Sequence, residues 1–137
     1  MMKKIILSIV LILSCVVSFC QDYYKAYTTE MHTYNNTSKE WELYQKNSDT
    51  DITIVIENEF LSIQGKSPSM YKIYTESKED ISNKNLIGVR YKARDLKHDT
   101  QVTIDIVKVT SNSTAMISVI NYNEGYNLRF FVKQVEL

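Results

Sequence analysis

The histidines and acidic runs of this sequence could carry metal or acid–base chemistry, but they lack the spacing that such chemistry needs. His32 and His98 are the only histidines, and they are far from the four-residue spacing of a two-ligand metal motif. Residues 47–51 alternate oxygen ligands like the start of a calcium loop, but Ile52 stands where the sharp-turn glycine belongs. No glycine-rich phosphate loop or nucleophile elbow occurs. We therefore expect no metal, no cofactor, no catalytic residues and no enzymatic activity.

Aromatic side chains point more directly to binding. The chain has ten tyrosines and one tryptophan. Rings with an apolar face and a polar tip suit a ligand cavity or a saccharide-stacking surface, although tyrosine also fits half-buried strands without any ligand. The candidate ligand-lining residues are the aromatic side chains that the strand register described below turns inward. They are Trp41, Tyr71, Tyr91, Tyr122 and Tyr126.

The charge pattern argues against a nucleic-acid partner. Sixteen basic and sixteen acidic side chains balance, whereas a nucleic-acid protein normally carries a concentrated basic surface. Arg90, Lys92 and Arg94 form an alternating basic stripe that could hold an anion. We favour a solvated face for this stripe because the register places Asp105 opposite Arg90.

The first twenty residues predict where the protein works. Lys3 and Lys4 precede an apolar run from Ile5 to Val17, and small residues stand at positions −3 and −1 of a cut before Gln21. The run is shorter than the roughly 20 apolar residues of a membrane-spanning helix. We therefore expect residues 1–20 to be a secretory signal peptide, residues 21–137 to form one domain, and the protein to be secreted or to lie in the periplasm or cell envelope.

Both cysteines of the chain lie in this leader. Cleavage before Gln21 removes Cys15 and Cys20 and leaves a mature chain without a thiol. The alternative is acylation at Cys15, because Ile12 and Ser14 partly match the box that precedes an acylated cysteine in bacterial lipoproteins. A membrane partner is expected only for that lipid-anchored form.

The second half of the mature chain reads as four strands that share one apolar face. We expect a hairpin around a three-residue loop, residues 123–125, which sets Ile120 opposite Leu128. Continuing backward, Ile104 faces Ile120 and Tyr91 faces Ile104. A one-residue slip would turn each apolar set outward, so agreement among neighbouring strands favours this register.

The first half continues the pattern with a two-residue hairpin at residues 58–59. This hairpin sets Ile56 opposite Leu61, and we expect Trp41 and Leu43 to lie against Ile56 and Ile54. With a weaker strand near residues 27–34, the sequence predicts an all-β fold, an antiparallel meander of eight or nine strands. We expect a closed or partly closed barrel, with a two-layer β-sandwich as the alternative.

The opposite face of this meander carries a candidate interaction surface. The predicted register places Val107, Ile117 and Phe131 side by side on three neighbouring strands, pointing away from the apolar face. Either another part of the chain covers this patch, or it binds a protein partner or a second copy.

A leader, one tryptophan near the start of the domain and a run of antiparallel strands together resemble the small secreted calycin-like proteins, best known from lipocalins. In the lipocalin signature a glycine stands two residues before the tryptophan, and here that position is Lys39. The chain also resembles short secreted bacterial proteins of unknown role. The lipocalin resemblance implies a barrel that carries a small apolar ligand. We expect a non-enzymatic protein that binds a small apolar or amphipathic ligand, or alternatively a protein-interaction module.

Overall fold

The computed structural model describes residues 22–48, 50–109 and 114–135, and these residues form nine antiparallel strands. The leader, with Cys15 and Cys20, lies outside the described residues. No described segment is a helix long and apolar enough to cross a membrane. The strands are β1 (Asp22–Asn35), β2 (Glu40–Asn47), β3 (Ile52–Glu57), β4 (Phe60–Gln64), β5 (Ser69–Asp80), β6 (Leu86–Asp95), β7 (Thr100–Val109), β8 (Thr114–Asn121) and β9 (Tyr126–Val135).

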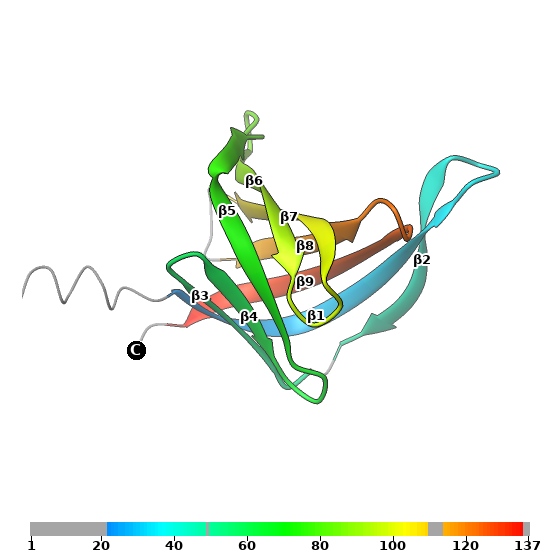
Figure 1. Cartoon of the computed structure of the whole chain (residues 1–137). Helices are drawn as coiled ribbons and strands as arrows, with labels where there is room; N and C mark the ends of the chain where they lie inside the picture. The colour runs from blue at the N-terminus through cyan, green and yellow to red at the C-terminus, as the bar shows by residue number, and fades with distance from the viewer. Residues whose placement is uncertain (1–21, 49, 110–113, 136–137) are drawn as a thin grey trace, which may run out of the picture.

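Eight of these strands close into a barrel, and β1 is the strand that closes it (Figure 1). From β3 to β9 each strand pairs with the next one along the chain. The first half of β1 lies between β3 and β9, so that Tyr23 is opposite Val55 on one side and Val135 on the other. Closure removes the exposed edges that an open sheet would present. The prediction of an all-β barrel is therefore confirmed.

Strand β2 lies outside the barrel. It pairs with the second half of β1, where Tyr34 is opposite Trp41, and the β1–β2 hairpin projects away from the body in Figure 1. The expectation that Trp41 and Leu43 pack against Ile54 and Ile56 is therefore wrong. The physical reason is the length of β1. Its pairing with β3 ends at Ala26, while the strand continues to Asn35, and this second half pairs with β2 on one edge and with β9 on the other.

Alternating aliphatic side chains fill the middle of the barrel. Ile54, Leu61, Ile104, Val119 and Val132 each expose 0% of their surface. Because successive side chains of a strand point to opposite faces, these residues fill the interior while their neighbours face outward. The interior is therefore packed at mid-height, and pockets lined by described residues lie toward the two ends of the strands.

Two predicted hairpins are confirmed residue by residue. Ile56 is opposite Leu61 between β3 and β4, as the two-residue turn at residues 58–59 required. Between β6 and β7, Tyr91 is opposite Ile104 and Arg90 is opposite Asp105. In both hairpins one face is clearly apolar and the other polar, so the sequence allows only one register.

Strand β8 is shifted by one residue from its predicted register. Val119, not Ile120, is opposite both Ile104 and Leu128. The β8–β9 loop is one residue longer than expected, because Asn121 pairs with Tyr126 and its carbonyl accepts a 2.9 Å hydrogen bond from the Gly125 amide. The strand has apolar residues on both faces, so hydrophobic alternation did not distinguish the two registers.

Candidate binding site at the barrel mouth

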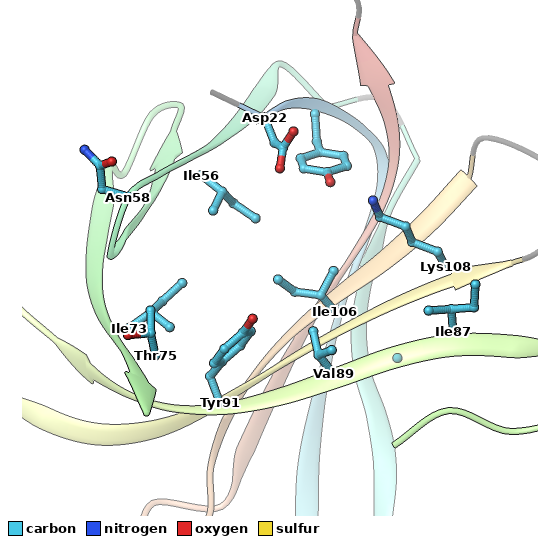
Figure 2. A pocket seen from close by; sticks show the side chains of 12 residues that line it. Asp22, Ile56, Asn58, Ile73, Thr75, Ile87, Val89, Tyr91, Ile106 and Lys108 are labelled. Carbon is cyan, nitrogen blue, oxygen red and sulfur yellow. The ribbon is translucent and has the colours of Figure 1, made fainter. Parts of the chain in front are cut away.

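An apolar pocket of about 290 Å³ opens at the end of the barrel where β1 begins (Figure 2). Side chains from β1, β3, β5, β6 and β7 surround it. Its lining residues are Asp22, Tyr24, Ile56, Asn58, Ile73, Thr75, Ile87, Gly88, Val89, Tyr91, Ile106 and Lys108.

Aliphatic side chains form the walls of the pocket. Ile56 and Ile106 lie across the open space from each other, and Ile73 and Val89 line it on either side of Tyr91 (Figure 2). Tyr91 points its hydroxyl toward the middle of this space (Figure 2). The inward orientation expected for Tyr91 is confirmed, and the walls can take an apolar chain while the phenol offers one hydrogen bond.

Charged groups stand at the rim. The Lys108 ammonium lies 6.0 Å from the centre of the Tyr24 ring, a cation–π contact. Among the residues that the structure describes, Lys108 belongs to no ion pair. Asp22 also lines the pocket, and its carboxylate accepts a long hydrogen bond, 3.4 Å, from the Gln134 amide. The site thus joins an apolar interior to a rim that carries an unpaired cation.

Tyr24 is a lining residue that the sequence analysis missed. It is buried, with 2% of its surface exposed, and it lies on the first part of β1. The expected strand began only near residue 27, after this tyrosine. The polar Lys25 stands between Tyr24 and Ala26, and this alternation could have shown that the strand begins before residue 27.

Tyr71 and Tyr126 line a different pocket, of about 440 Å³, at the opposite end of the strands. Tyr71 is buried as expected, and burial, followed by the nearby Asp95 carboxylate, raises its pKa above the ordinary value. Asp95 accepts hydrogen bonds from the backbone amides of Lys97 and His98 and contacts His98 Nδ1 at 2.9 Å. These contacts hold the β6–β7 turn, so the aspartate has a structural task at this end.

The remaining two aromatic candidates do not point into the barrel. Trp41 lies on β2, with its ring centre 5.3 Å from that of Tyr34 and 6.4 Å from that of Tyr122 in edge-on contacts. Tyr122 is 60% exposed, because it sits in the β8–β9 turn and not at the end of β8. The expectation that Trp41 and Tyr122 line a ligand cavity is therefore wrong.

No family model, no curated protein and no solved structure matches this chain.

The proposed outward patch needs one correction. Ile117 is fully buried in the barrel core, so it is not an exposed interaction residue. Because β8 is shifted by one residue, Met116 takes the outward position that was expected for Ile117. Met116 is opposite both Val107 and Phe131. Val107, Met116 and Phe131 are all half-buried and form one row on the outside of the barrel.

Opposite charges neutralise part of the basic stripe. Arg90 pairs with Asp105, and Arg94 contacts Asp99 at 2.6 Å. These partners occupy the guanidinium groups that could have held an anion. We take the pocket that Lys108 lines as the candidate binding site, because aliphatic side chains form most of its walls.

Proposed function

We propose that the protein is a non-enzymatic binding protein that holds a small amphipathic molecule in the mouth of its barrel. The observation that carries this proposal is the combination of aliphatic walls with the ammonium of Lys108 at the rim, which forms no ion pair with any residue that the structure describes. A ligand with an apolar chain and a polar end would bury the chain among Ile56, Ile73 and Ile106 and leave its head beside Lys108. The leader, residues 1–20, supports action outside the cytoplasm or in the cell envelope.

The volume of the pocket limits the ligand to a small one. Small-molecule sites usually measure about 300–1,000 Å³, and this pocket, at about 290 Å³, lies at the lower end of that range. Below it, fully buried side chains such as Ile104 and Val119 fill the barrel. We therefore propose a short alkyl or small cyclic ligand that enters only the first layers of the interior.

The test is calorimetric titration of the protein with octanol, octanoate and octylamine. Ile106→Trp fills the pocket and should abolish binding of all three probes. Leu128→Trp is the matched control, because it adds the same bulk at the opposite end of the barrel, where Leu128 lines the other pocket. Circular dichroism checks that both variants keep the β fold. Binding that survives Ile106→Trp, or no binding of any probe to the unaltered protein, would contradict the proposal.

Head-group preference tests the role of Lys108. Because its ammonium has no carboxylate partner in the described part of the chain, we expect octanoate to bind more tightly than octylamine. Lys108→Gln should remove that preference and leave octanol binding unchanged. Equal affinities of octanoate and octylamine for the unaltered protein would show that Lys108 does not interact with the head group of the ligand.

A further inference from the structure

Two lysines face each other across the seam that closes the barrel. Lys25 on β1 is directly opposite Lys133 on β9, and both are exposed on the outer surface. Like charges in directly opposite positions of an antiparallel pair destabilise it. The seam therefore carries a local excess of positive charge.

Neither lysine forms an ion pair with another residue that the structure describes. The ion pairs among the described residues join His32 to Glu30, Arg90 to Asp105, Arg94 to Asp99 and His98 to Asp95. Elsewhere on the same two strands opposite charges face each other, since Glu30 on β1 is opposite Arg129 on β9. At Lys25 and Lys133 the two charges are alike.

Lys25 and Lys133 both line a hollow of about 420 Å³. A bulge in β1 between Ala26 and Thr28 turns Tyr27 outward, and the Lys133 ammonium lies 5.7 Å from the centre of its ring. Ser48 and Thr50, both in the connection between β2 and β3, add hydroxyl groups to the same hollow. The Thr50 hydroxyl donates its hydrogen to the Ala26 carbonyl at 2.6 Å, which fixes this wall against β1.

We propose that this hollow binds a tetrahedral oxyanion, a phosphate or sulfate group, between Lys25 and Lys133. A bound dianion would convert the repulsion between the two lysines into charge-assisted hydrogen bonds from both, and the Ser48 hydroxyl can donate a further one. The lysine ammonium suits this task because it is a compact charge with three donors on a flexible stem. The site lies on the outside of the barrel and is independent of the pocket at the mouth.

Thermal unfolding in sodium phosphate and in sodium chloride of equal ionic strength tests the site. We expect phosphate to raise the melting temperature above its value in chloride, because a ligand that binds only the folded state stabilises it. Lys25→Gln and Lys133→Gln should each weaken phosphate binding by about tenfold or more, the value of one hydrogen bond to a charged group. Lys66→Gln is the matched control, since it removes an equal charge from the exposed β4–β5 turn.

The unliganded variants give a second, independent signature. Without phosphate, Lys25→Gln should melt at or above the temperature of the unaltered protein, because it removes the repulsion, and Lys25 forms no ion pair among the described residues. A merely structural lysine would instead lower the melting temperature when it is replaced. A clear loss of stability in Lys25→Gln without phosphate would contradict the proposal.

Vesicles separate the two sources of a phosphate group. Binding of free phosphate that Lys25→Gln weakens assigns the site to a soluble oxyanion. Sedimentation with phosphatidylglycerol vesicles, and not with phosphatidylcholine vesicles, that Lys25→Gln weakens assigns it to an anionic lipid head group. The proposal would be overturned if the unaltered protein bound neither phosphate nor phosphatidylglycerol vesicles. It would also be overturned if both lysine variants bound them as well as the unaltered protein does.

Discussion

Arg90 and Asp105 form a bidentate ion pair across β6 and β7, with Arg90 Nε 2.8 Å from Asp105 Oδ1 and Nη2 2.9 Å from Oδ2. The Asp105 side chain is 11% exposed and that of Arg90 is 38% exposed. The hydrogen bond from Arg90 to Asp105 raises the pKa of the guanidinium, so Arg90 stays charged over the working pH range. This pair fixes the register of the two strands from the outside of the barrel.

A double-mutant cycle measures this pair. Asp105→Asn should destabilise the fold, because it leaves the half-buried guanidinium without its charged partner, and Arg90→Gln should do so for the converse reason. We expect a coupling free energy of about 1 kcal/mol, since half of the pair is solvent-exposed. Urea unfolding of the two single variants and the double variant gives the value. Strictly additive effects would show that the two side chains do not interact in solution.

The register of β8 makes a prediction for two neighbouring residues. Ile117→Ala should cost about 2–5 kcal/mol of unfolding free energy, because it opens a cavity in the packed interior. Met116→Ala should cost less, because Met116 is half-buried on the outside of the barrel. Chemical denaturation of both variants decides the matter. A larger loss of unfolding free energy for Met116→Ala than for Ile117→Ala would contradict this register and support the one in which Ile117 points outward.

Gly125 closes the β8–β9 turn in a left-handed conformation, with φ at 72°. Gly125→Ala should therefore cost about 1 kcal/mol, the penalty of a side chain in this region. Crowding does not add to this cost, because a Cβ at this position would lie 3.5 Å from Tyr34 Cβ, an ordinary contact. Gly125→Asn should lose less, since asparagine tolerates the left-handed region. Equal losses for the two variants would mean that backbone conformation is not the cause.

Tyr71 predicts how the protein responds to alkali. Burial raises its pKa above the ordinary value of 10.0, so the folded state holds the phenol proton more tightly than the unfolded state does. Above about pH 10 the unfolded chain binds fewer protons than the folded one, and the free energy of unfolding falls as the pH rises. Tyr71→Phe should flatten this decline. The measurement is urea unfolding at a series of alkaline pH values, and identical slopes for the two proteins would contradict the prediction.

Sequence pattern predicted the barrel because most strands carry one apolar and one polar face. Val102 and Ile104 alternate with the polar residues Gln101, Thr103 and Asp105, so only one register turns the aliphatic side chains into the barrel. The shift of β8 could not be predicted in this way. Its sequence places Met116 and Ile120 on one face and Ile117 and Val119 on the other, and either choice would bury aliphatic side chains.

The candidate site was only partly predictable, for a reason of topology. Tyr91 was assigned correctly because its strand pairs with its sequence neighbour. Trp41 was assigned wrongly, because β2 pairs with the second half of β1. No local sequence pattern shows that one edge of β1 changes its partner from β3 to β2. The rim residues Asp22 and Lys108 meet only after closure, since β1 and β7 are far apart in the chain.

The closing position of β1 also constrains the order of folding. Asp22 and Gln134 stand 112 residues apart along the chain, and they meet only when β1 joins β9. Contacts of such sequence separation form late, because the entropy of bringing distant segments together must be lost before the contacts stabilise the chain. During synthesis β2 and β3 can pair with one edge of β1 soon after it emerges, whereas its other edge stays without a partner until β9, the last strand, has been made.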